Sequence, residues 1–235
     1  MQNPIIELQF DKKLDQDIAW QFYNNPNIGG VDFWQERVIK FHPKLKDIDK
    51  EKDKKKFLSN YILAYYNEHQ KELEKLSKEV DINLGQKQDK FFEKTAKIFN
   101  DYPWPTKKIM GNFSIFNFCP RFLDDNEFQV FLYDDKDHQS FTIFHECLHF
   151  LFYDYAKKKF PKTLGKMETE SGSFWDLAEV FNVVSQNTED FKSLHGEIKD
   201  IKYPEHKKLI EYGMDIFNKD KDVYKWIKEM LKVIK

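Results

Sequence analysis

Two histidines and a glutamate near the middle of the chain have the spacing of two metal ligands and a general base. His145, Glu146 and His149 form the pattern H-E-x-x-H inside an apolar stretch that favours a buried helix. Four helical positions span about 400° and roughly 6 Å, so both imidazoles lie on one face, as neighbouring ligands of a tetrahedral zinc ion require. Glu146 points to the side, toward a water held on such an ion. The pattern predicts a zinc site with Glu146 as general base.

Two histidines buried in one helix have a simpler explanation that needs no metal. Ordinary hydrogen bonds can satisfy each imidazole separately. That explanation leaves the glutamate between them without a role, because an unpaired carboxylate in an apolar helix is costly. The zinc site is therefore the favoured hypothesis.

A catalytic zinc also needs a third protein ligand and an open fourth position. Phe152 and Tyr155 stand where a longer G-x-x-H extension of the motif needs Gly and His, so the third ligand must lie further along the chain. The segment from Ser173 to Val184 is expected to be a buried helix with Ser173 as its N-cap. Glu179 lies in its second turn, beyond the reach of the cap, where a cation is the natural partner of a buried carboxylate. Glu179 is the predicted third ligand.

Other polar residues remain open for the same or a supporting role. Asp176 stands three positions after Ser173, where a capping box explains it without a metal. Asn182, one turn after Glu179, either fixes the tautomer of a ligand imidazole or caps backbone groups. The remaining alternatives for the third ligand are Asp176, His195, Glu168 and Glu170.

The elements that position these residues are expected to be mostly helices. Before residue 101 the pattern predicts a strand at 5–10 and helices at 14–23, 32–41, 54–80 and 86–100. The segment from Tyr102 to Pro105 contains two prolines and ends helix propagation. After it, the pattern predicts strands at 112–118 and 127–133, a helix from about residue 139, and helices at 174–186, 206–218 and 222–234.

Length and composition fit a folded protein of this kind. With 235 residues, 40% hydrophobic, 33% charged and only 8 Gly and 8 Pro, disordered, low-complexity and collagen-like classes are disfavoured. The expected class is α+β, mostly helical, with a small sheet before the active-site helix. The expected division is a helical region at 1–101, forming a wall or cover of a cleft, and a catalytic region at 102–235.

Charge and hydropathy argue against nucleic-acid and membrane partners. The net charge is −2, and Arg37 and Arg121 are the two arginines of the chain. We find no stretch with the length of a membrane span and no signal-peptide pattern at the N-terminus. Cys119 and Cys147 are expected to be free core thiols. The expected location is the cytoplasm.

The motif and the later glutamate together resemble a known group of enzymes. His145, Glu146 and His149, followed by a helix bearing Glu179, resemble the zincin metallopeptidases, and among them the glutamate-liganded gluzincins typified by thermolysin. The resemblance covers residues 112–184. It implies zinc held by the two histidines and Glu179, Glu146 as base, and a peptide-binding cleft. The strand at 127–133 would match the edge strand that pairs with an extended substrate.

The resemblance also directs attention to the C-terminal part of the chain. Gluzincins commonly stabilise the oxyanion with a Tyr or His from that part, and here Tyr203, His206 and Tyr212 are available, of which we select His206 and Tyr212. Two features depart from thermolysin. Val183 stands where an aspartate supports the zinc ligands, so Asn182 or Asp176 would have to substitute, and the gap of thirty positions from His149 to Glu179 is longer.

These observations predict an intracellular zinc metallopeptidase that hydrolyses a peptide or protein substrate. The alternative from a different class is a non-catalytic zincin-like scaffold that binds a peptide or protein partner. Within the hydrolases, a narrowly specific processing protease is a further alternative. The oligomeric state is not indicated by any pattern in the sequence.

Overall fold

The structure is a computed structural model that describes residues 3–28, 30–197 and 203–234. Helices predominate, and a small mixed sheet precedes the helix that carries the H-E-x-x-H motif, which confirms the predicted α+β, mostly helical class. The chain forms two compact units. The sheet unit comprises residues 6–83 and 110–135, and the helical unit comprises residues 1–5, 84–109 and 136–235.

The two units do not follow the division at residue 101/102 expected from the prolines. Each unit is assembled from separate stretches of chain. In the sheet unit this follows from the pairing of strands that are distant in sequence. The assignment of 1–101 as a cover and 102–235 as a catalytic region stays a prediction.

The sheet unit is built around four strands in the order β1-β4-β6-β5. Strands β4 and β6 are parallel, with Phe113 opposite Val130, whereas β6 and β5 are antiparallel. Side chains of β4 and β6 are almost all buried, as expected of central strands. The elements of this unit are β1 (Ile5–Phe10), α1 (Lys12–Asn24), β2 (Asn27–Ile28), β3 (Val31–Asp32), a π-helical segment (Trp34–Val38), α2 (Ile39–Phe41), a 3₁₀ helix (Pro43–Lys50), α3 (Lys54–Glu68), β4 (Lys108–Ser114), β5 (Arg121–Phe122) and β6 (Glu127–Phe131).

Strand β6 is not the open edge strand that the resemblance implied. Its partner β5 occupies the side away from β4, opposite Glu127 and Phe128. The next backbone N–H on that side, of Gln129, donates to the carbonyl of Pro120 at 2.9 Å. An extended substrate therefore cannot pair with this part of the strand while β5 is in place.

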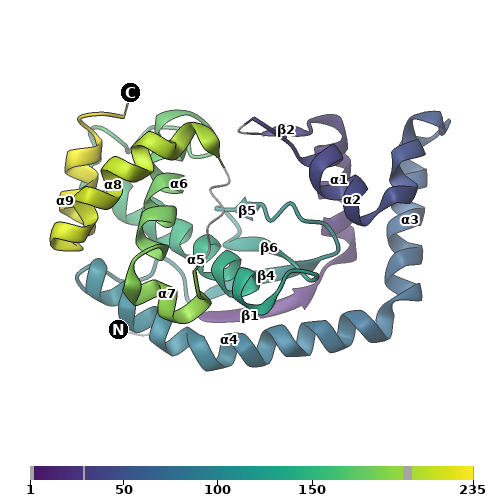
Figure 1. Ribbon diagram of the computed structural model, residues 1–235, viewed down its shortest axis with the longest axis horizontal. Helices are drawn as coiled ribbons and strands as arrows, with labels where there is room; N and C mark the ends of the chain where they lie inside the picture. Colours follow the sequence, from purple (N-terminus) through teal and green to yellow (C-terminus); the bar gives the residue numbers. More distant parts are fainter. Residues whose placement is uncertain (1–2, 29, 198–202, 235) are drawn as a thin grey trace. The chain divides into compact units, whose positions relative to one another are not determined.

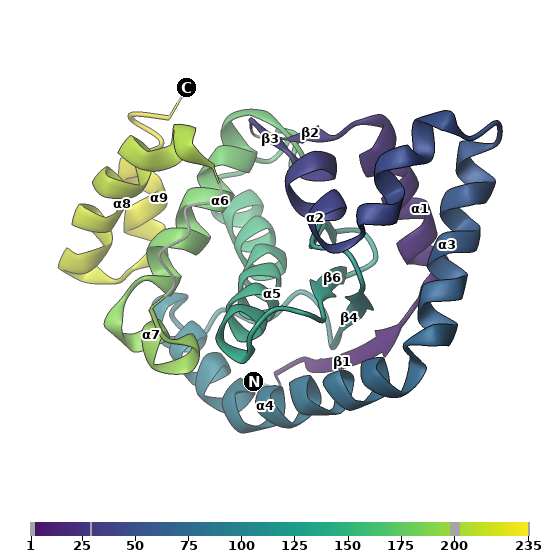
Figure 2. The same cartoon turned by 45° about the vertical axis from the view of Figure 1, so that its right-hand side comes forward.

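In the helical unit, long helices pack side by side. In Figures 1 and 2, α6 lies between α5 and α8, and α9 lies beside α8. Aromatic rings join these helices: the ring of Phe152 of α5 stacks on Phe181 of α6 with centroids 4.5 Å apart, and Phe181 meets Trp226 of α9 edge to face at 5.3 Å. The elements are α4 (Gln70–Ile98, which begins in the sheet unit), α5 (Lys136–Lys159), α6 (Gly172–Gln186), α7 (Glu189–His195), a 3₁₀ helix (Pro204–His206), α8 (Lys207–Asp220) and α9 (Val223–Met230).

The break predicted between the helices at 54–80 and 86–100 lies at a different residue in the structure. The break lies at His69, which ends α3 and precedes α4, and the chain stays helical through Gly85. A helical glycine costs only about 1 kcal/mol, which the buried side chains of α4 on either side outweigh. The predicted helix at 32–41 is also wrong at its start, where β3 and the π-helical segment precede α2.

None of the described helices combines the length and apolar character needed to cross a membrane. Both cysteines are buried thiols that form no disulfide, as predicted.

Candidate metal centre

Helix α5 brings the two histidines together in the interior of the helical unit. Every residue from Gln139 to Tyr153 is buried, and Lys157, Lys158 and Lys159 in the last turn complement the negative end of the helix dipole. His145 and His149 lie one turn apart with ring centroids at 4.8 Å, and their Nε2 atoms are 3.1 Å apart. The structure thus agrees with the predicted common face.

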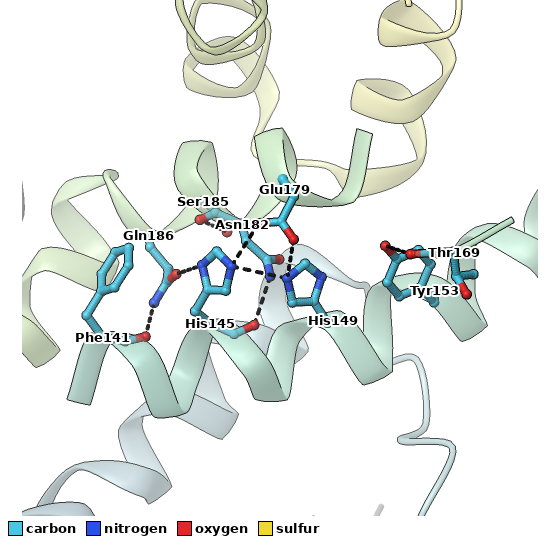
Figure 3. Close-up of polar contacts among 9 residues, drawn as sticks. All are labelled: Phe141, His145, His149, Tyr153, Thr169, Glu179, Asn182, Ser185 and Gln186. Atoms are coloured by element: carbon cyan, nitrogen blue, oxygen red, sulfur yellow. Dashed lines mark hydrogen bonds and ion pairs between the residues drawn. The ribbon is translucent and has the colours of Figure 1, made fainter. Parts of the chain in front are cut away.

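Glu179 approaches this pair from α6, as Figure 3 shows. Its Oε2 lies 3.3 Å from Nε2 of His145, and its Oε1 lies 3.3 Å from Nε2 of His149. In a tetrahedral zinc site with bonds of 2.0–2.1 Å, neighbouring ligand atoms are about 3.3 Å apart. The separations among the three side chains therefore match the edges of such a tetrahedron, and the buried group can hold a metal ion.

The charge state of Glu179 also suits a cation. The carboxylate is buried, at 4% exposure, and burial raises its pKa. The imidazoles of His149 and His145 outweigh that effect and hold the pKa of Glu179 well below its usual range. An ionised carboxylate and two imidazoles form a donor set typical of zinc.

One stripe of α6 contacts His145 at three points. Glu179 approaches Nε2, Asn182 donates from Nδ2 to the backbone carbonyl at 2.8 Å, and Gln186 accepts at 3.1 Å from Nδ1 (Figure 3). The alternative that Asn182 binds backbone is thus the one observed. The role of Gln186 was not predicted from the sequence. It stands seven positions after Glu179 on the same helical face, and a buried amide in an apolar helix could have indicated that role.

His149 is held by an aromatic neighbour on its own helix. The ring of Tyr153 lies 5.7 Å from the imidazole, nearly parallel to it, and the Tyr153 hydroxyl donates to the carbonyl of Thr169 at 2.9 Å (Figure 3). Thr169 belongs to the connection between α5 and α6. Tyr153 therefore packs on the candidate ligand His149 and also forms a hydrogen bond to the segment that leads to α6.

The two residues between the histidines have different surroundings. Glu146 is buried at 3% exposure, adjacent to His145 in sequence. Cys147 is fully buried, and burial, followed by the charge of Glu146, raises the pKa of its thiol well above the usual value. Cys147 is therefore a packing residue, and thiolate ligation is disfavoured.

The predicted N-cap of α6 is wrong by two positions. The helix starts at Gly172 after Ser171, so Ser173 lies inside the first turn, and the capping box with Asp176 does not form. Asp176 instead accepts a hydrogen bond at 2.8 Å from Nε2 of His206. This pair lies about one helical turn from Glu179 along α6.

The other predicted residues lie outside the three-residue group. Tyr212, on α8, is 40% exposed, and Glu168 and Glu170 are exposed. His195, on α7, is buried, and its Nδ1 donates to the carbonyl of Gly196 at 2.9 Å. Among the described residues, only His145, His149 and Glu179 form a group of candidate metal ligands.

Comparison of the chain with protein-family models, with curated proteins and with solved structures gives no match. The candidate centre therefore stands on its own geometry and chemistry.

Proposed function

We propose that this protein is a zinc-dependent metallopeptidase of gluzincin type that hydrolyses peptide or protein substrates. The observation that carries the proposal is the set of near-equal separations among His145, His149 and Glu179, which match the ligand edges of a tetrahedral zinc ion. Two imidazoles and one carboxylate favour zinc over Mg²⁺ or Ca²⁺, which prefer oxygen ligands in larger numbers.

The proposed chemistry assigns one role to the metal and separate roles to the side chains. His145, His149 and Glu179 would hold the zinc, which would supply Lewis-acid activation of a water and of the peptide carbonyl. Glu146 would take a proton from the water that attacks the carbonyl carbon and return it to the leaving amine as the peptide C–N bond breaks. His206, oriented by Asp176, and Tyr212 are the proposed donors to the oxyanion; the short His206–Asp176 contact favours His206.

Elemental analysis combined with one substitution tests the proposal. Metal-free protein reloaded with zinc should retain about one zinc per chain, and His149→Ala should not. Glu146→Gln should keep the zinc and lower hydrolysis of a mixed peptide library by about 10²–10⁴-fold, because only the proton acceptor is removed. The matched control is Cys147→Ala, the neighbouring buried position, which should keep both zinc and turnover.

Three results would contradict parts of the proposal. Full turnover in Glu146→Gln would remove that residue from the mechanism. Protein that binds no zinc and keeps its stability in chelator would favour the non-catalytic scaffold. A zinc-loaded protein that leaves the whole library uncut would exclude a broad peptidase and leave a narrowly specific processing protease or a scaffold.

A further inference from the structure

Gln186 makes two hydrogen bonds that together determine where the imidazole of His145 carries its proton. The amide is fully buried at the end of α6. Its Nε2 donates to the backbone carbonyl of Phe141 at 2.9 Å, and its Oε1 lies 3.1 Å from Nδ1 of His145. Phe141 stands one turn before His145 on α5, so the amide joins two successive turns of that helix.

The orientation of this amide follows from the chemistry of its backbone partner. A carbonyl oxygen only accepts hydrogen bonds, so the group facing Phe141 must be the NH₂ of Gln186. The amide oxygen then faces Nδ1 of His145. Because that oxygen has no hydrogen to donate, a hydrogen bond forms only if Nδ1 carries the proton.

A neutral imidazole protonated at Nδ1 presents a lone pair at Nε2. That is the atom of His145 nearest to Glu179 and to Nε2 of His149. Metal-ligating histidines commonly have their second nitrogen fixed in this way by a carboxylate, a backbone carbonyl or water. Here a side-chain amide occupies that position.

We infer that Gln186 is a positioning residue that locks His145 in the Nδ1-protonated tautomer and so prepares Nε2 to bind the metal. The inference rests on the proposed metal site. Because Gln186 and Glu179 lie two turns apart on the same face of α6, one rigid helix supplies both a ligand and the group that orients another ligand.

Two substitutions separate orientation from packing. Gln186→Leu removes both hydrogen bonds, and zinc affinity, measured by competition with a chelator, should fall about 10–100-fold. Gln186→Glu also loses the donor to Phe141 but keeps an acceptor toward Nδ1 of His145, so it should bind zinc at least about tenfold more tightly than the leucine variant. The control Ser185→Ala, which removes a buried hydroxyl that donates to the carbonyl of Asn182, should leave affinity unchanged.

The tautomer itself can be observed without metal or substrate. In ¹⁵N NMR spectra of the metal-free protein at a pH where His145 is neutral, its proton should be on Nδ1, and Gln186→Leu should show a mixture that includes the Nε2–H form. A wild-type imidazole protonated at Nε2, or equal zinc affinities of the leucine and glutamate variants, would overturn the inference. If zinc binding follows the expected order but no peptide of the library is cleaved, the proposal of a broad peptidase fails and the role of Gln186 stands.

Discussion

The sheet unit and the helical unit each contain an almost completely buried carboxylate, Asp15 and Glu179 respectively, and these two carboxylates have opposite surroundings. Asp15 in the sheet unit is 1% exposed, and Glu179 in the helical unit is 4% exposed. A buried carboxylate is costly unless its oxygens are paired, so each must have a compensating partner. What differs is the kind of partner.

Asp15 is surrounded by fixed neutral donors. It accepts hydrogen bonds from the hydroxyl of Tyr66 at 2.7 Å, from Nε2 of Gln129 at 2.8 Å and from the backbone N–H of Ile115 at 3.2 Å. Burial raises the pKa of Asp15 to about 6, although these hydrogen bonds act in the opposite direction. This carboxylate joins α1 to the strands and needs no further ligand.

Glu179 faces imidazole nitrogens instead. Burial raises its pKa, but the two histidines more than offset that effect. When the imidazoles are neutral and one presents a lone pair, as Gln186 requires of His145, the cluster contains more acceptors than protons. The comparison teaches that the type of neighbour, and not burial, distinguishes a structural carboxylate from a candidate metal ligand.

The stabilisation of the protein by added zinc should differ most between variants of the two carboxylates. At a free zinc concentration near a thousand times Kd, the free energy of unfolding should rise by about 4 kcal/mol. Glu179→Gln should lose most of that increase, whereas Asp15→Asn should keep it. Urea unfolding with and without zinc measures this increase for both variants. Loss of the increase in Asp15→Asn would contradict the assignment of Glu179 as the metal ligand.

The pH dependence of stability should give the next largest difference. Asp15 has a pKa of about 6 in the folded chain and 3.8 as the reference value, so between these pH values the folded state holds a proton that the unfolded state has lost. The contribution of Asp15 to the free energy of unfolding should therefore fall by roughly 3 kcal/mol as the pH rises from about 3 to about 7. For Glu179 the sign is opposite, since its lowered pKa gives stability that is lost as the pH falls.

A difference curve isolates this effect from other buried groups. Burial lowers the pKa of His195 to about 4, so that residue changes stability in the opposite direction over the same range. Relative to wild type, the free energy of unfolding of Asp15→Asn should rise by about 3 kcal/mol between about pH 3 and 7. The amide can be accommodated because Oε1 of Gln129 has no hydrogen-bond partner in the described part of the chain and can turn to accept from it. Asp17→Asn, at a position on the same helix whose side chain is 45% exposed, is the control. A flat difference curve for Asp15→Asn would contradict the assignment.

Removal of a single donor should have the smallest effect. Tyr66→Phe deletes the hydroxyl that donates to Asp15, and at pH 7 it should lower the free energy of unfolding by about 2 kcal/mol, a typical value for a hydrogen bond to a charged group. The loss should shrink as the pH falls below about 6, where Asp15 in the folded chain is protonated. The control Tyr65→Phe removes a hydroxyl that donates to another tyrosine and should cost less. Equal losses of unfolding free energy at pH 7 and at the lower pH would show that the Tyr66 hydroxyl does not stabilise the ionised Asp15.

Much of the local structure could be predicted from the sequence because it depends on short-range periodicity. The strand at 5–10 and the helix at 174–186 appear close to their predicted bounds. Helix ends were predicted less accurately. The break at His69 and the start of α6 at Gly172 differ from the prediction, because caps depend on a few local contacts. Pairing of β6 with β5 was missed, since a two-residue strand has too few residues to show a period.

The sequence by itself determined the relation between His145 and His149. Both belong to one helix, and backbone hydrogen bonds within that helix set their separation whatever surrounds it. The same spacing placed Glu146 to the side. The sequence also singled out Glu179 among several acidic residues, because it is a charged group in an apolar helix.

Only the tertiary structure decided which side chains of α6 meet which atoms of α5. Thirty positions separate His149 from Glu179, and the register between the two helices is set by packing of rings such as Phe152 and Phe181. Because of that register, Gln186 contacts the imidazole of His145, whereas Asn182, the amide considered from the sequence, contacts a backbone carbonyl. Tertiary packing also pairs Asp176 with His206. Contacts of this kind depend on the shapes of two packed surfaces, which no single stretch of sequence contains.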